Sequence, residues 1–215
     1  IGLLYILYFM VIAFSVSSEM GQVIKTAFMP LTPNWVFVII SILVSAYAVG
    51  RDIEVIARIN EILLPLGLAV LEFLLLVNIN DFNFGYFLPV LKEGFIPPIR
   101  GSLIILGWMS ELVAILQVLP FVNKPENMNK AVYFGMLMVC IGIMSGTLIY
   151  ALFGPLTELL LIPSLEFARF ASLGKYLYNF DLLIMAIWVT GIFVKIMVFY
   201  HVSAFSLAQL WKADN

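Results

Sequence analysis

The chain has 215 residues, of which 63% are hydrophobic and 11% are charged, and its mean hydropathy is +1.09. Soluble domains carry about 25% charged residues, so this composition excludes an ordinary soluble domain and predicts a membrane protein. The formal net charge of −2 and the lack of a basic stripe argue against nucleic-acid binding. With Cys140 as its one cysteine, the chain cannot form an internal disulfide or a cysteine-based metal site.

Six apolar runs reach, or nearly reach, the roughly 20 residues that span about 30 Å of hydrocarbon. Because open sheet edges cannot face lipid, we expect these runs to be helices. In chain order they cover approximately residues 3–28, 35–49, 59–77, 102–122, 131–153 and 180–203. The second run is short, and Pro65 is expected to kink the third. Residues 164–174 suggest a short re-entrant or interfacial helix.

These runs predict an all-α polytopic membrane helix bundle. We treat residues 1–215 as a single transmembrane domain. Its first residue is Ile1, inside an apolar stretch with no charged segment before it, so we expect a piece of a longer protein. Lys and Arg are denser in the short connections 50–58 and 123–130 than in the long connections 78–101 and 154–179. The positive-inside rule therefore places the short connections in the cytoplasm.

Four charged residues lie inside apolar runs, namely Glu19, Glu72, Glu111 and Lys195, and Asp181 begins the last run. A charge at the centre of a membrane helix costs at least about 2.5 kcal/mol, so each needs a facing partner. One interpretation is a Lys–Glu pair that holds helices together. The other is an ion site, a ligand contact or a proton relay, with Glu72, Lys195 and Asp181 as candidate charge-pair or ion-site residues.

The segment around Glu111 has the strongest functional signal. Gly107 can adopt conformations closed to other residues, and a helix broken there would free backbone groups to bind a small zwitterion or an ion. Trp108 would form one wall of such a pocket. Gly107, Trp108, Ser110 and Glu111 are therefore the candidate ligand-binding residues. The alternative is that Gly107 only permits close helix packing and Trp108 sits in an ordinary interface.

Other features have simpler explanations. Gly142 and Gly146 fit a small-xxx-small pattern, which favours a helix-packing face. His201 is the only histidine, so no H-E-x-x-H zinc site exists, and no G-x-S-x-G elbow or phosphate-binding glycine loop appears. We therefore expect no enzyme activity, no metal and no cofactor. The only carboxylate couple available to an intramembrane enzyme, Glu72 with Glu111, ranks far below the other hypotheses.

Four segments form a recognisable series along the chain. They are residues 49–62 with Pro65, residues 87–91 followed by Gly94 and Pro98, Gly154 with Pro163 and Glu166, and residues 181–195. Together and in this order they resemble the spore germination permease family, the B subunits of nutrient germinant receptors. One departure is that Tyr178 and Asn179 stand where the family pattern has Glu-Arg, which puts the role of that pair in doubt here.

This family is similar to the amino acid–polyamine–cation (APC) transporter superfamily. The resemblance implies a ten-helix core of two inverted five-helix repeats, with broken first and sixth helices around a central site. The chain would supply roughly the third to eighth helices of this five-plus-five inverted-repeat fold. Residues 107–111 would then lie on the sixth helix, and the first helix, which carries the other half of the site, would lie outside these residues. The implied orientation agrees with the loop charges.

The function implied is a germinant-receptor membrane subunit. It would bind a small nutrient, an amino acid or a sugar, at a midplane pocket and trigger spore germination. Its partners would be the A and C receptor subunits and membrane lipid, in the inner membrane of a bacterial spore. The alternative is an autonomous amino acid or cation transporter of the same fold, since fold does not decide between sensor and carrier.

Overall fold

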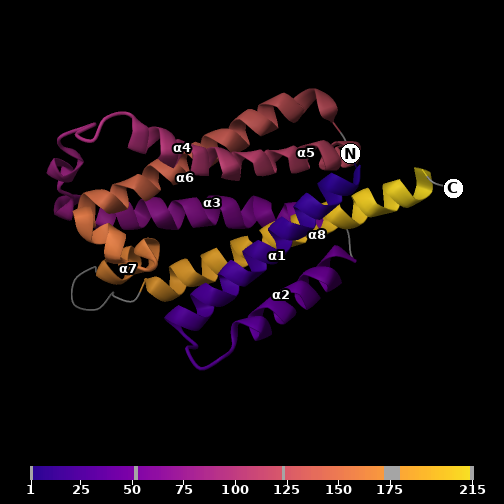
Figure 1. Cartoon of the computed structure of the whole chain (residues 1–215), viewed down its shortest axis with the longest axis horizontal. Helices are drawn as coiled ribbons and strands as arrows, with labels where there is room; N and C mark the ends of the chain where they lie inside the picture. Colours follow the sequence, from indigo (N-terminus) through magenta and orange to yellow (C-terminus); the bar gives the residue numbers. More distant parts are fainter. Residues whose placement is uncertain (1, 51–52, 123, 172–179, 214–215) are drawn as a thin grey trace. The chain divides into compact units, whose positions relative to one another are not determined.

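The computed structural model describes residues 2–50, 53–122, 124–171 and 180–213 (Figure 1). Every regular element in these ranges is helical. The α-helices are α1 (Gly2–Ala27), α2 (Asn34–Val49), α3 (Ile53–Val77), α4 (Ile96–Met109), α5 (Ile115–Val118), α6 (Met128–Phe153), α7 (Pro163–Phe170) and α8 (Asp181–Ala213). The 3₁₀ turns are η1 (Ile79–Asp81), η2 (Phe84–Phe87), η3 (Ser110–Ala114), η4 (Leu119–Phe121), η5 (Pro125–Asn127) and η6 (Gly154–Leu159).

The predicted all-α membrane bundle is confirmed. Among the described residues, five helical stretches are long and apolar enough to cross a membrane: Gly2–Ala27, Ile53–Val77, Ile96–Phe121, Met128–Leu159 and Asp181–Trp211. The sixth predicted span is α2, whose 16 residues extend about 24 Å at 1.5 Å per residue, short of the hydrocarbon thickness. Pro65 lies inside α3, which continues as a helix on both sides of it.

The predicted boundaries differ most at the last helix. It was expected to end near Ser203 and instead reaches Ala213. The prediction followed the end of the apolar run, whereas the backbone hydrogen bonds of the helix continue beyond that run. The predicted short helix after residue 163 is present as α7, whereas residues 172–179, which include Gly174, Tyr178 and Asn179, lie outside the described part.

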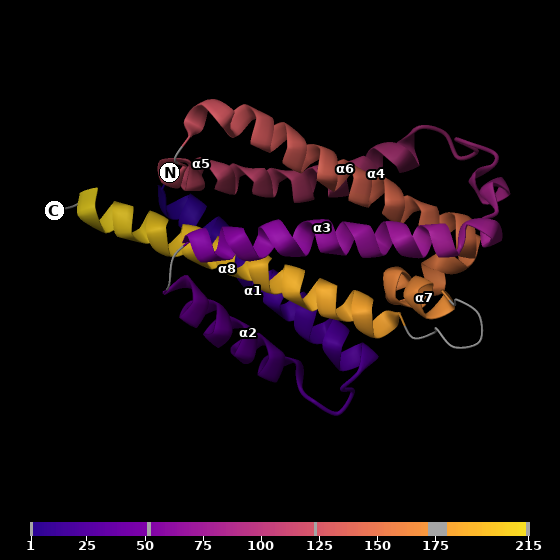
Figure 2. The same cartoon turned by 180° about the vertical axis from the view of Figure 1, so that it is seen from behind.

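Contacts divide the chain into two compact units, residues 1–74 with 168–215, and residues 75–167. The core of the first unit lies where α1 runs antiparallel to α8 (Figures 1 and 2). The buried ring of Phe9 lies 6.0 Å from that of Phe199, and a Cβ built at Gly2 would lie 3.5 Å from Leu210. The helix α2 packs against both α1 and α8.

The helix α3 also runs antiparallel to α8 in this unit. Near one end, the rings of Phe73 and Phe180 lie 6.0 Å apart in an edge-on arrangement. Near the other end, Ile56 is buried with Val194 and Met197. These contacts fix the register between the two helices, which decides which of their charged residues lie at the same level.

In the second unit, the connection after α3 folds onto the end of α6. The Asn83 N–H donates to the Ala151 carbonyl over 2.8 Å, and the Phe87 and Tyr150 rings lie 5.5 Å apart. Gly154 adopts φ 54° where the chain leaves α6, and a Cβ there would lie 2.8 Å from the Tyr86 ring. Glycine is therefore required here both by conformation and by space.

Candidate functional site

The helical stretch that carries Glu111 changes its geometry three residues after Gly107, the predicted position of a break. The helix α4 ends at Met109, and the 3₁₀ turn η3 begins at Ser110. A 3₁₀ stretch inside a longer helix often marks a functional hinge or local strain. The chain does not unwind, however, because the Ser110 N–H still donates to the Leu106 carbonyl. Gly107 remains helical and does not adopt a positive φ.

The four candidate ligand-binding residues lie within one and a half turns of this junction. Glu111 is half-buried, whereas Gly107, Trp108 and Ser110 are exposed. The Ser110 hydroxyl donates to the Gly107 carbonyl over 2.6 Å, so this polar group is engaged with its own helix. A Cβ at Gly107 would meet nothing within 4 Å. Within the second unit this face is therefore open, and Glu111 is the least exposed of the four residues.

Of the predicted charge partners, Glu72 and Lys195 belong to the first unit, in which they lie at different levels. Lys195 lies between Val194 and Met197, which contact Ile56 near the start of α3. Glu72 adjoins Phe73, whose ring meets Phe180, and Phe180 precedes Lys195 by fifteen residues, or about 22 Å of helix. A direct ion pair between Glu72 and Lys195 is therefore not the arrangement in this structure, although each side chain has other interactions.

Asp181 lies at the same end of the α3–α8 pair as Glu72. Its Oδ2 accepts a hydrogen bond from the Arg169 Nε over 3.3 Å, which joins the start of α8 to α7. Its Oδ1 accepts from the Leu182 N–H over 3.0 Å, at the first turn of α8, where negative charge complements the helix dipole. Asp181 is thus a structural anchor between two helices in this arrangement.

Gly146, in the predicted packing face on α6, and the charged residue Glu19 of α1 are both open to their surroundings. A Cβ at Gly146 would meet nothing within 4 Å, and Glu19 is exposed. Close packing occurs instead at Gly21 of α1, where a Cβ would overlap the Asn34 side chain and lie 3.2 Å from the Asn34 carbonyl. The spacing of Ser17 and Gly21 is a small-xxx-small pattern that sequence reasoning missed.

Two described features therefore define the class of protein. The chain is a multi-pass helical membrane protein, and the part that the structure describes contains five helical stretches able to span a membrane. One of these stretches carries an interruption beside a half-buried carboxylate.

The whole chain, residues 1–215, matches the family model described as spore germination protein. The chain belongs to this family of germination permeases, as the four resembling segments predicted. No solved structure gives a significant match, so the inverted-repeat arrangement stays a prediction.

Relatives of known name agree with this assignment. Spore germination protein YndE of Bacillus subtilis (strain 168) is 24% identical over 99% of this chain and 59% of its own length. Spore germination protein XB of Bacillus anthracis is 26% identical over 79% of this chain and 48% of its own length. Spore germination protein KB of Bacillus subtilis (strain 168) is 24% identical over 99% of the chain and 58% of its own length. The chain thus spans about half to three fifths of these relatives.

Proposed function

We propose that this chain is part of a germinant-receptor membrane subunit that binds a small nutrient, with an amino acid as the first candidate class. Membership of a family of spore germination proteins supports the physiological role. The single observation that supports the binding role is the 3₁₀ interruption at Ser110–Ala114, which carries Glu111 inside a helical stretch otherwise suited to lipid.

The physical argument concerns the carboxylate. A charge within a membrane span is expensive and is retained where it faces protein, water or a ligand. A primary ammonium group offers three donors, so it matches a carboxylate that is half-buried among apolar side chains. The exposed indole of Trp108, one turn earlier, offers a π-face to the same cation. An amino acid or another amine-bearing nutrient fits this pair better than a neutral sugar does.

In this proposal, Glu72 and Lys195 are secondary candidates for an ion site. Asp181 stabilises the first turn of α8 through its hydrogen bonds to Arg169 and Leu182. The A and C receptor subunits would respond to ligand binding by this subunit, in the inner membrane of a bacterial spore. Binding shifts a two-state protein only by its differential affinity for the two states. The helix interruption at Ser110–Ala114 is the element that could differ between them.

Uptake and binding by the full-length protein in proteoliposomes distinguish the sensor from the carrier. A panel of amino acids and sugars is tested for binding, and the ligands that bind are then tested for accumulation inside the vesicles. The proposal predicts saturable binding of an amine-bearing nutrient without net accumulation, and a germination response that requires the partner subunits. Accumulation by the protein alone would support the autonomous transporter instead.

A further inference from the structure

The charged residue Glu19 is not part of the nutrient site proposed above, and it lies on a polar side of α1. Ser15, Glu19, Gln22 and Thr26 follow one another at intervals of four, three and four residues. At about 100° per residue these positions fall within about 60° around the helix axis, and they extend about 16 Å along it. All four residues are exposed. We call these four residues the polar stripe of α1.

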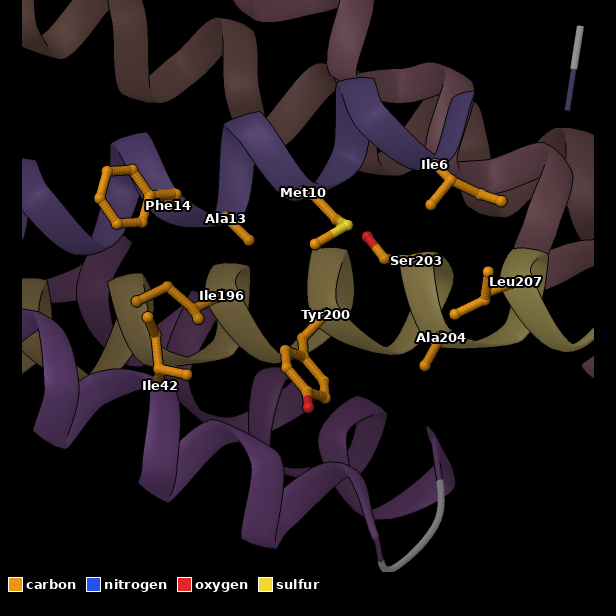
Figure 3. A pocket seen from close by; sticks show the side chains of 10 residues that line it. All are labelled: Ile6, Met10, Ala13, Phe14, Ile42, Ile196, Tyr200, Ser203, Ala204 and Leu207. Atoms are coloured by element: carbon orange, nitrogen blue, oxygen red, sulfur yellow. The ribbon is translucent and has the colours of Figure 1, made fainter. Parts of the chain in front are cut away.

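The polar stripe lies opposite the packed side of α1. The buried residues of this helix are Ile6, Phe9, Val16, Ser17, Met20 and Gly21, which are centred about 160° around the axis from the stripe. Figure 3 shows part of the packed side, where Ile6 and Ala13 face α8. Small residues let membrane helices approach closely, and α1 has Ser17 and Gly21 on its packed side. The longer side chains of the stripe do not favour such close contact.

Hydrocarbon is an unfavourable medium for the polar stripe. The helix α1 is one of the stretches able to span a membrane, and Glu19 lies about 12 Å from its last residue, Ala27. A carboxylate at such a depth is expensive unless it faces water, protein or an ion. The nearest basic residue on the helix, Lys25, follows by six residues and so lies about 240° further round, outside the spacing of an i,i+3 or i,i+4 pair. The charge of Glu19 is therefore available to a group outside its own helix.

The polarity of this side of α1 changes near the middle of the helix. Leu4 and Val11 lie on the same side as the polar stripe and are 69% and 62% exposed. Ser15, the first residue of the stripe, is halfway along the 26-residue helix. Loop charge places residues 50–58 in the cytoplasm, so the end of α1, one helix earlier, lies toward the opposite surface. The polar stripe thus runs from the middle of the bilayer to the non-cytoplasmic surface, as the wall of a water-filled cavity open at that surface would.

We propose that the polar stripe lines a water-filled passage that leads monovalent cations from the non-cytoplasmic surface to the middle of the bilayer. Glu19 attracts the cation, because a charge beside low-dielectric walls raises the local concentration of the opposite charge. Divalent cations in proteins gather several carboxylates, whereas the stripe offers one. The Thr26 hydroxyl donates to the Gln22 carbonyl over 2.8 Å, which leaves its oxygen as an acceptor for water. The proposal is independent of the nutrient site, since every residue of the stripe belongs to α1.

The test measures the reaction of single cysteines in the full-length protein with a cationic, membrane-impermeant methanethiosulfonate added to the non-cytoplasmic side. The background carries Cys140→Ser and no other cysteine. Ser15→Cys and Gln22→Cys test the stripe, and Phe14→Cys and Val11→Cys are the controls. Phe14 adjoins Ser15 at the same depth and is 60% exposed, but it lies about 100° away around the helix. Because the reagent attacks ionised thiols, the stripe cysteines should react about tenfold faster than the controls, or more.

Two results of this first arm would overturn the proposal. Equally slow reaction at all four positions would show that a protein segment covers the stripe. Equally fast reaction at all four would show that water surrounds this part of α1 without a passage. Both results are obtained with Glu19 in place, so they hold even if a Glu19 variant fails to fold.

A second arm tests the preference for cations. At Gln22→Cys, the rate with the cationic reagent is divided by the rate with an anionic sulfonate analogue. Glu19→Gln removes the charge and should lower this ratio about threefold or more, whereas Glu19→Asp keeps the charge and should preserve most of it. An unchanged ratio in Glu19→Gln would overturn the assignment of Glu19 as the group that attracts cations.

Discussion

Gly21 and Gly154 are the residues at which the structure depends most directly on the absence of a side chain. At Gly21 the α1–α2 contact leaves no room for a Cβ, and the Asn34 Nδ2 donates to the Ser18 hydroxyl over 3.3 Å beside it. At Gly154 the positive φ and the Tyr86 ring act together. Both positions hold a connection against the end of a membrane helix.

We predict that Gly21→Val destabilises the protein by about 1–3 kcal/mol, the usual range for overpacking a tight contact. The expected result is a lower midpoint of thermal unfolding in detergent. Gly146→Val is the control, because a Cβ there meets nothing within 4 Å, and it should change the midpoint much less. Equal effects of the two variants would show that the α1–α2 contact is not the tight one.

Gly154→Ala should destabilise the connection between α6 and α7 by more than 1 kcal/mol, since an L-residue is strained at φ 54° and its Cβ would strike the Tyr86 ring. Hydrogen exchange at residues 83–88 measures the effect, because this loop packs on the end of α6. The double variant Gly154→Ala/Tyr86→Ala removes the clash but keeps the strain. Its partial recovery would separate the two causes, and unchanged exchange in Gly154→Ala would contradict both.

Sequence reasoning identified the charged positions at the residue scale but not their partners. Hydropathy alone marks Glu72, Glu111, Lys195 and Asp181 as expensive, because the cost belongs to the residue and its run. The partner depends on helix register, which no local pattern specifies. The Arg169–Asp181 pair and the separation of Glu72 from Lys195 therefore emerge only from the fold.

At the scale of elements, the helical stretch Ile96–Phe121 and the α7–α8 corner are the two informative structures. The first was predicted to be interrupted near Gly107, and the geometry does change one turn later, at Ser110. The type of change, a 3₁₀ turn with its hydrogen bonds retained, was not predicted, because a glycine permits a break without requiring one. The α7–α8 corner includes the Arg169–Asp181 pair, which joins residues twelve positions apart and which no local pattern predicts.

Loss of the α7–α8 ion pair should have a small, local effect. The Arg169 and Asp181 side chains are 40% and 15% exposed, so solvent screens the pair and its contribution is about 0.2–1 kcal/mol. Arg169→Gln should raise hydrogen exchange in α7 while leaving the unfolding midpoint nearly unchanged. A global loss of stability from Arg169→Gln would show that the pair does more than anchor one short helix.

In the whole molecule, the all-α membrane class follows from the apolar runs, since about 20 apolar residues in a row are typical of a membrane-spanning helix. The number of spans followed less closely, because six were predicted and only five described helical stretches are long enough. The pairing of helices within each unit does not follow from the sequence, because helices with apolar faces on every side can be packed in many ways. The apolar pocket between α1, α2 and α8 was not predicted either (Figure 3). Ala13, Ser203 and Ala204 look like ordinary packing residues until the helices that carry them are paired.

Loop charge predicts the orientation of the chain in the membrane. In a Cys140→Ser background, a cysteine at Lys130 should react with a membrane-impermeant maleimide only from the cytoplasmic side. A cysteine at Lys92, in the long connection after α3, should react only from the opposite side. Labelling of both cysteines from one side would contradict the alternation of spans, and reversed labelling would contradict the positive-inside assignment.

The proposed contact between Glu111 and the nutrient is tested by ligand affinity measured on three forms of the full-length protein. These are the wild type, Glu111→Gln, and the control Glu126→Gln, which removes an exposed carboxylate in η5. A hydrogen bond to a charged group contributes about 1.5–3 kcal/mol, so Glu111→Gln should weaken binding roughly 10- to 150-fold while membrane insertion stays intact. The control should bind as the wild type does. Unchanged affinity and an unchanged germination response in Glu111→Gln would show that Glu111 does not contact the nutrient.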